Sequence, residues 1–143
     1  MQNRIDREEF APASADEVAA LLSNWESGQL HRHVERVLTF VERNRSDILR
    51  IAGYTADAEA LVSTAKRVIV QSGTVHSPSE MRDQIHEIQD EIWIRGERGD
   101  YGRENIAHEW TSQHAANWRR WRLTEYLFVA DRLAQEIVAR LGA

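Results

Sequence analysis

Apolar residues recur along this chain at spacings of three and four positions, and they do not alternate with polar residues as they would in a strand. Spacings of three and four place apolar side chains on one face of an α-helix. The pattern therefore predicts an all-α fold, a helical bundle of about five helices. The expected helices cover residues 14–26, 29–52, 55–73, 77–93 and 103–141.

The C-terminal helix is expected to be the longest. Residues 103–141 contain no proline or glycine and are rich in strong helix formers, so one continuous helix of roughly 55–60 Å is predicted. Its second half carries an apolar stripe of Leu123, Leu127, Ala130, Ala134, Ile137 and Leu141. The first half continues this stripe with Ile106, Trp110, His114, Trp118 and Trp121. A surface of this size needs a partner, either the other helices or a second subunit.

Polar caps and glycines indicate where the other helices begin and end. Ser14 and Glu17 form a capping box for the first helix, Gly28 ends it, and Gly73 ends the third. The segment 77–80, with the sequence Ser-Pro-Ser-Glu, predicts the start of the fourth helix, with serine as the cap. Four apolar residues follow in that helix at spacings of four, three and four: Met81, Ile85, Ile88 and Ile92.

The connection between the fourth and fifth helices, residues 95–102, is short. It predicts that these two helices form an antiparallel hairpin. Pairing outward from Gly99 sets acidic residues of the fourth helix against Arg119, Arg120 and Arg122 of the fifth. Exposed ion pairs contribute only about 0.2–1 kcal/mol each, so they would set the register of the hairpin more than its stability.

The composition restricts the class of protein. A chain of 143 residues can bury one core, so a single domain over residues 14–143 is expected, preceded by a flexible arm of residues 1–13. The net charge of −5 confines any contact with nucleic acid to a local basic patch. The absence of cysteine excludes disulfides and thiolate metal sites. With no secretory leader and no run of about 18 apolar residues, a cytoplasmic protein without a membrane partner is expected.

A short motif at the start of the last helix suggests chemistry. Arg103 is followed after four residues by His108, and Trp110 comes two positions later. This spacing resembles the R-x4-H-x-Y signature of HEPN-domain ribonucleases, small all-α proteins that need no metal, with tryptophan here in place of tyrosine. The resemblance implies an RNA substrate and a site between two protomers. It also implies that His108 activates the ribose 2′-hydroxyl or protonates the leaving oxygen, while Arg103 holds the scissile phosphate.

The segment before this motif has a composition typical of an anion site. Residues 95–103 hold a glycine at every third position, together with Arg95, Arg98 and Arg103. Glycines allow backbone amides to converge on an anion, and arginines supply positive charge, so Arg95 and Arg98 are candidate phosphate-binding residues. A tight helix-hairpin turn with solvated charges explains the same composition.

Residues 117–122 interleave two tryptophans with three arginines. Such a row can stack nucleic-acid bases, bind a protein partner or form the edge of a core. The alternative to a ribonuclease is therefore a non-catalytic helical module for interaction or oligomerisation. Its expected surface consists of Trp110, Trp118, Arg119, Trp121 and Arg122. A homodimer is expected, because the tryptophan and leucine surfaces exceed what the shorter helices can cover.

No metal or cofactor site is predicted. Carboxylate-bridged di-metal bundles need an acid-x-x-histidine motif on each of two helices. This chain has one such motif, Asp83 with His86. The expected function therefore needs no cofactor.

Overall fold

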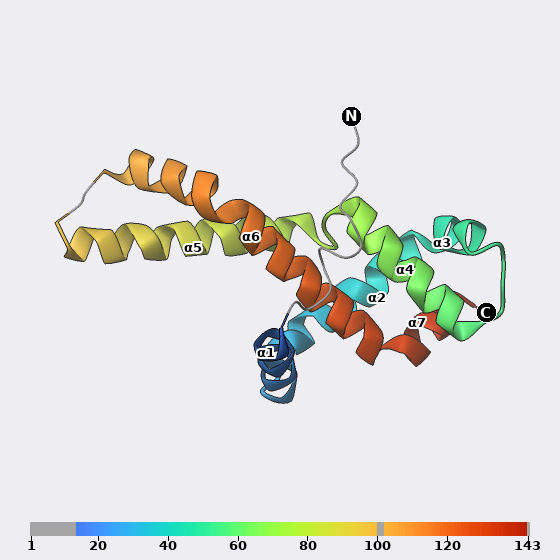
Figure 1. The fold of residues 1–143 in the computed structure, drawn as a ribbon. Coiled ribbons are helices and arrows are strands. Elements are labelled where there is room, and N and C mark those ends of the chain that lie inside the picture. Colours follow the sequence, from blue (N-terminus) through green and yellow to red (C-terminus); the bar gives the residue numbers. More distant parts are fainter. Residues whose placement is uncertain (1–13, 100–101, 143) are drawn as a thin grey trace. The chain divides into compact units, whose positions relative to one another are not determined.

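A computed structural model of the chain describes residues 14–99 and 102–142, and it confirms the all-α fold (Figure 1). The predicted arm, residues 1–13, lies outside the described residues. Within the described residues no helix is long and apolar enough to span a membrane. The elements are α1 (Ala15–Glu26), the 3-10 helix η2 (Gln29–His33), α2 (Val34–Arg43), α3 (Arg45–Ile51), α4 (Ala58–Ser72), α5 (Ser77–Glu97), α6 (Arg103–Arg132) and α7 (Ala134–Arg140).

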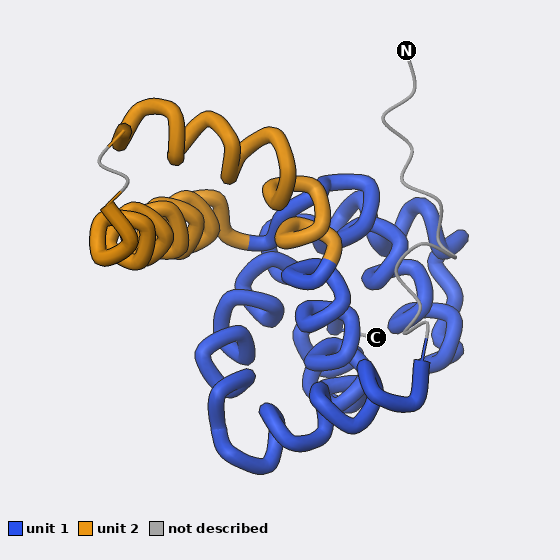
Figure 2. The backbone as a smooth tube through the Cα atoms, turned by 60° about the vertical axis from the view of Figure 1, so that its left-hand side comes forward, with its two compact units in different colours: residues 1–75, 121–143 blue, residues 76–120 orange. Residues whose placement is uncertain are grey.

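The chain divides into two compact units (Figure 2). Unit 1 comprises residues 1–75 and 121–143, and unit 2 comprises residues 76–120, so α6 contributes to both. In unit 1, α7 packs against α2 and α4, and α3 packs against the same two helices. The hydrophobic core lies in this unit. Its fully buried side chains include Leu21, Leu30, Val37, Val41, Ile48, Leu61, Ile69, Leu123, Tyr126, Ile137 and Leu141.

Several predicted helix ends are confirmed by the backbone. The Ser14 side chain accepts a hydrogen bond from the Glu17 amide at 3.2 Å, which satisfies one free donor of the first turn of α1. Gly73 ends α4 in the left-handed region, with φ of 80°. The start of α4 differs from the prediction at residue 55, because Asp57 caps it by accepting from the Ala60 amide at 3.1 Å.

The helix predicted over residues 29–52 consists of three elements, η2, α2 and α3. The break between α2 and α3 falls at Asn44, whose backbone has φ of −104° and ψ of 16°. Its side-chain amide donates to the Phe40 carbonyl at 2.8 Å. Asparagine side chains compete with the helical hydrogen bonds in this way, which explains a break without proline or glycine.

The prediction of one helix over residues 103–141 is wrong, since the helix breaks at Leu133 and separates α6 from α7. Leu133 is buried, and α7 is fixed to unit 1 by polar contacts. The Arg45 side chain donates to the Leu141 carbonyl at 2.9 Å, and Arg140 pairs with Glu42 at 2.9 Å. Packing of α7 against α2 and α4 accounts for the break, which no local residue type indicates.

In unit 2, α5 is longer than predicted. His76, not Ser77, caps it, and its Nδ1 accepts from the Ser79 amide at 3.2 Å. The helix continues past the expected end at Trp93 to Glu97. Part of the predicted connection is therefore helical, and residues 100–101 of it lie outside the described residues.

Candidate functional site

One side of α5 is polar and is joined to α6 by ion pairs. Arg95 pairs with Glu91 at 2.9 Å and also with Glu109 of α6. Hydrogen bonds to Glu109 and Glu91 raise the pKa of Arg95 above its ordinary value. Near the other end of α5, Arg119 of α6 lies 3.7 Å from the buried Glu80. The ion pairs from α5 to α6 therefore use charged groups on one side of α5, while the first half of α6 also holds two buried apolar side chains, Ile106 and Trp110.

A neighbouring side of α5 is apolar and open to solvent. Met81 is 65% exposed and Ile85 is 49% exposed, while Ile88 and Ile92 are half-buried. At about 100° per residue these four side chains fall within an arc of roughly 60°. We call this row, Met81, Ile85, Ile88 and Ile92, the α5 stripe. Contiguous apolar surface of this kind marks interaction sites in proteins, so the stripe is the leading candidate site.

Arg103 and His108 lie in the first two turns of α6, and both side chains are exposed. Within the part of the chain that the structure describes, neither side chain forms an ion pair or a side-chain hydrogen bond. Five positions along a helix correspond to about 140° of rotation, so the two side chains leave α6 in different directions. Both groups are accessible to an anion, but one chain alone does not bring them together.

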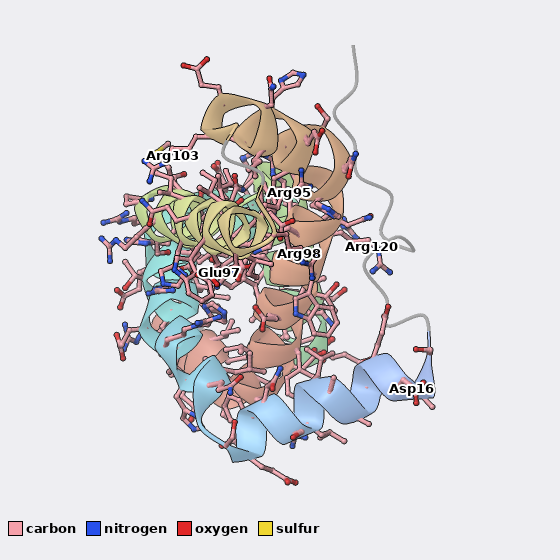
Figure 3. The ribbon with its side chains drawn as sticks, turned by 90° about the vertical axis from the view of Figure 1, so that its left-hand side faces the viewer. Asp16, Arg95, Glu97, Arg98, Arg103 and Arg120 are labelled. Carbon is pink, nitrogen blue, oxygen red and sulfur yellow. The ribbon has the colours of Figure 1, made fainter. Side chains whose placement is uncertain are left out.

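The two arginines predicted to bind phosphate have different surroundings. Figure 3 labels Arg95 and Arg98 near the end of α5 and Arg103 at the start of α6. Arg95 is held by two carboxylates, whereas Arg98 is exposed at the C-terminal cap of α5. The nest of amides predicted for this segment includes residues 100–101, which the structure does not describe. The anion site therefore stays a prediction.

The predicted interaction surface on α6 is largely turned inward. Trp110 and Arg122 are buried, and Trp118 and Trp121 are half-buried. Arg119 is exposed and pairs with Glu80. The large apolar side chains of unit 2 that face solvent among the described residues therefore belong to α5. They are Met81, Ile85, Trp93 and Ile94.

Unit 1 contains a buried polar cluster that the sequence did not indicate. His33 is fully buried, and its Nε2 lies 3.2 Å from Nη1 of Arg122 and 3.4 Å from Oε1 of Glu125. The Tyr126 ring packs edge-on against the imidazole at 4.7 Å. A guanidinium only donates and a carboxylate only accepts, so Nε2 accepts from Arg122 in one tautomer of the imidazole and donates to Glu125 in the other. Burial lowers the pKa of His33 below its ordinary value of 6.5.

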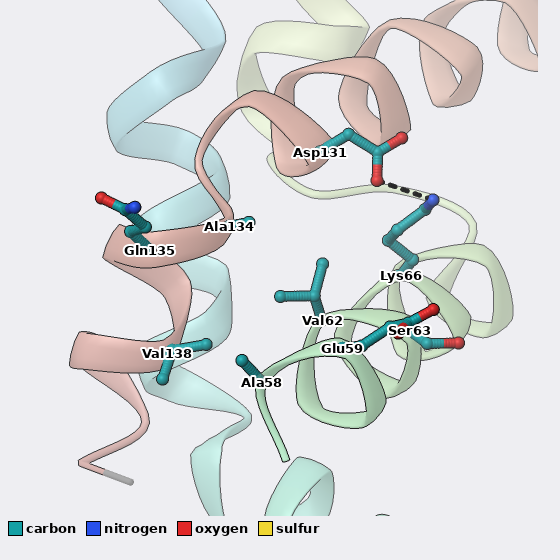
Figure 4. Close-up of a pocket in the computed structure, with 9 residues that line it drawn as sticks. All are labelled: Ala58, Glu59, Val62, Ser63, Lys66, Asp131, Ala134, Gln135 and Val138. Atoms are coloured by element: carbon teal, nitrogen blue, oxygen red, sulfur yellow. Dashed lines mark hydrogen bonds and ion pairs between the residues drawn. The ribbon is translucent and has the colours of Figure 1, made fainter.

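Unit 1 also has a groove between α4 and α7 with a volume of about 610 Å³ (Figure 4). Lys66, the only lysine in the sequence, pairs with Asp131 at 2.8 Å across one end. The other polar residues that line the groove are Glu59, Ser63 and Gln135. Its aliphatic lining consists of Ala58, Val62, Ala134 and Val138.

The spacing of the α5 stripe is visible in the sequence, but its exposure to solvent was not predicted. The indication that it is open was present in the sequence. Glu80 and Arg95 occupy the adjacent side of the same helix and form the ion pairs to α6. A helix that turns a charged side toward its neighbour leaves its apolar side for another partner. His33 was missed because its partners, Arg122 and Glu125, lie about ninety positions away in sequence.

Among the described residues, no group of three or more histidine, aspartate and glutamate side chains could hold a metal ion. His86 of the single acid-x-x-histidine motif pairs with Asp90 at 3.3 Å. Comparison of the chain with protein families, with curated proteins and with solved structures gave no match.

Proposed function

We propose that the protein is a helical interaction module that self-associates, and that the α5 stripe forms the interface between two copies of the chain. The observation that carries this proposal is the exposure of Met81 and Ile85, two members of one apolar row. Single apolar side chains are common at protein surfaces. Four of them in a row with spacings of four and three are typical of a helix that packs along another helix.

The charges beside the stripe favour a second copy as the partner. Arg82, Gln84, Gln89 and Glu91 flank the row and supply one positive, one negative and two neutral side chains. When the stripe of one chain meets the same stripe of another, these flanks need not set like charges against each other. Two copies of the stripe can therefore pack together without repulsion between their flanks. Flanking residues that all had the same charge would prevent this.

We also propose that α5 and residues 103–120 of α6 pair as an antiparallel hairpin. Two ion pairs support this arrangement. Arg95, near the end of α5, pairs with Glu109 near the start of α6, and Glu80, near the start of α5, pairs with Arg119 further along α6. In unit 2, Ile106 and Trp110 of α6 are buried, whereas Met81 and Ile85 of α5 stay exposed, which gives a reason for the hairpin to associate.

The test replaces Ile85 with glutamate. We expect the wild-type chain to sediment at twice the 16.5 kDa of one chain, and the Ile85→Glu variant to sediment as a monomer. A charge at this position cannot be buried without a partner, and in a symmetrical dimer the change occurs twice. A loss of about 1.5 kcal/mol at each site already weakens association by roughly 100-fold.

Ile94→Glu is the matched control, because Ile94 is an exposed isoleucine on the same helix, about 150° away from the centre of the stripe. This variant should remain dimeric, and circular dichroism should show the helix content of both variants unchanged. A wild-type chain that stays monomeric at concentrations of tens of micromolar would overturn the proposal. So would equal loss of association in both variants.

A second candidate function is metal-independent cleavage of RNA by Arg103 and His108. It is supported by the exposure of both side chains at the start of α6, where the positive end of the helix dipole favours a phosphate. The chemistry is that of the HEPN-like motif. His108 would act as general base or acid, and Arg103 would bind the phosphate through its paired donors.

His108→Ala is the test of this second function. We expect RNA cleavage to fall by about 100-fold or more, which is the lower range for loss of a general acid or base. His86→Ala, at an exposed histidine outside the motif, should leave cleavage unchanged. Cleavage that survives in the His108 variant, or that is absent from the wild-type protein, would exclude this function without affecting the case for self-association.

A further inference from the structure

The proposed self-association leaves open how the two α5 helices are oriented. We infer that they pack antiparallel, with Met81 against the partner's Ile92 and Ile85 against the partner's Ile88. This inference rests on the proposed function and adds the direction and the register of the pair. Three features of unit 2 lead to it: the spacing of the stripe, the position of α6 beside α5, and the helix dipoles.

The spacing of the stripe reads the same in both directions. Its intervals of four, three and four residues are symmetrical about the midpoint between His86 and Glu87. Turning α5 end over end therefore returns every apolar position of the stripe to an apolar position. Met81 and Ile88 occupy one heptad position, and Ile85 and Ile92 occupy the other. Antiparallel pairing sets residues of the first position against residues of the second. All four members of the stripe then find an apolar partner at the same time.

Two sides of α5 meet at an angle that suits a four-helix bundle. The residues of α5 that pair with α6 are Glu80 and Arg95, which lie on one side of the stripe, about 110° and 50° around the helix from its centre and about 80° on average. In a four-helix bundle each helix has two neighbours at roughly a right angle. One neighbour of α5 is α6, so the helix of the second copy occupies the other position.

The relative direction of the two α5 helices follows from the positions that the two α6 segments take. If the α5 helices run antiparallel, the twofold axis is perpendicular to them and both α6 segments lie on the same side of the pair. Two hairpins then close into one bundle of four helices. If the α5 helices run parallel, the α6 segments lie on opposite sides and the bundle stays open. Antiparallel packing also opposes the dipoles of neighbouring helices, which adds a small stabilisation.

The flanking side chains fit the antiparallel register. Arg82 faces the partner's Gln89 along one edge of the stripe, and Gln84 faces the partner's Glu91 along the other. Each of these pairs joins a charged group to an amide that can supply the complementary donor or acceptor. No like charges oppose each other along either edge.

Because the chain contains no cysteine, engineered cysteines report on this register without background. Met81→Cys and Ile92→Cys are prepared separately, mixed under reducing conditions and then oxidised. We expect a disulfide between the two different variants and none within either variant alone. In the antiparallel register two copies of position 81 are eleven residues apart along the axis, about 16 Å, which exceeds the separation of about 7 Å that a disulfide can bridge.

Ile94→Cys, on the far side of α5, is the control for random collision and should not cross-link with either variant. A second pair keeps the apolar side chains intact. Arg82→Cys mixed with Gln89→Cys should be joined by a short bismaleimide, and neither variant should be joined to itself. Sedimentation under reducing conditions first checks that each cysteine variant still associates. If a variant at Met81 or Ile92 does not, the pair at Arg82 and Gln89 is used instead.

The outcomes separate this inference from the proposal beneath it. Cross-links within each single variant, with none between the different variants, would establish parallel helices and overturn the inference while self-association stands. A dimer with no cross-link in either pair would overturn it as well, since it would place the interface elsewhere. A wild-type chain without any dimer would remove the proposed function itself.

Discussion

Replacing Glu125 with glutamine is expected to reduce the free energy of unfolding by about 3–5 kcal/mol, the range found when one partner of a buried ion pair is removed. The Glu125 carboxylate lies 3.9 Å from Nε of Arg122 and 3.4 Å from Nε2 of His33, and all three side chains are buried. Glutamine has nearly the same shape as glutamate, so the loss of stability reports the effect of removing the negative charge. Without the carboxylate, the buried Arg122 guanidinium loses the negative charge of Glu125 beside it.

Urea denaturation of the wild type and of Glu125→Gln measures this loss. The informative control is the double variant Arg122→Met with Glu125→Leu, which removes both charges and retains apolar volume. Because a buried pair is offset by the cost of desolvating its members, the double variant should be less destabilised than the single variant. If Glu125→Gln costs less than about 1 kcal/mol, the carboxylate does not compensate Arg122 and this account of the cluster is wrong.

The same region shows which parts of the fold the sequence could predict. Periodic apolar residues in residues 123–141 predicted a buried stripe, and Leu123, Ala130, Ile137 and Leu141 are indeed buried. The helix break at Leu133 could not be predicted from this pattern. Leu133 continues the periodicity, and the break arises from packing of α7 on α2 and α4, helices that are distant in the sequence. Local patterns determine which face is apolar, whereas distant helices determine where the axis bends.

The candidate sites illustrate a different limit. Periodicity predicted the row of Met81, Ile85, Ile88 and Ile92, but a row of apolar residues does not specify what covers it. That information came from the position of α6 beside the charged side of α5. Conversely, the motif of Arg103 and His108 was visible in the sequence, while the directions of the two side chains depend on the helix that carries them.

The two candidate functions place different demands on a dimer. A HEPN-like site between protomers requires the motifs of two chains to approach each other. In the antiparallel register the two α5 helices end at opposite ends of the bundle, and α6 begins soon after α5 ends. The two copies of Arg103 would then lie far apart, and any catalysis would use one chain at a time. Cross-links that establish the antiparallel register therefore weigh against a composite ribonuclease site.

Stability should also fall as the pH is lowered below 6.5, and His33 is the group responsible. Burial lowers the pKa of its imidazole in the folded protein, and the charge of Arg122 and of Arg32 acts in the same direction, while Glu125 opposes the shift. In the unfolded chain the imidazole takes up a proton near its ordinary value of 6.5. Between the lowered folded pKa and 6.5, the unfolded state therefore binds one proton more than the folded state.

This difference sets the sign and the size of the effect. Stability rises with pH wherever the unfolded state binds more protons, so the contribution of His33 is complete above pH 6.5 and is lost as the pH falls toward the folded pKa. One proton corresponds to a slope of at most about 1.4 kcal/mol per pH unit. Protonation of the imidazole would also set a second positive charge beside the Arg122 guanidinium, whose Nη1 lies 3.2 Å from Nε2.

Urea denaturation of the wild type and of His33→Gln at a series of pH values between 5 and 8 tests this account. Glutamine can accept from Arg122 and donate to Glu125, but it does not titrate, so the curve of this variant should be flatter below pH 6.5 by up to one proton. His108→Gln changes an exposed histidine and should retain the wild-type slope. If His33→Gln and the wild type have parallel curves, the buried imidazole is not the titrating group. The pH dependence would then have to come from side chains outside the cluster of His33, Arg122 and Glu125.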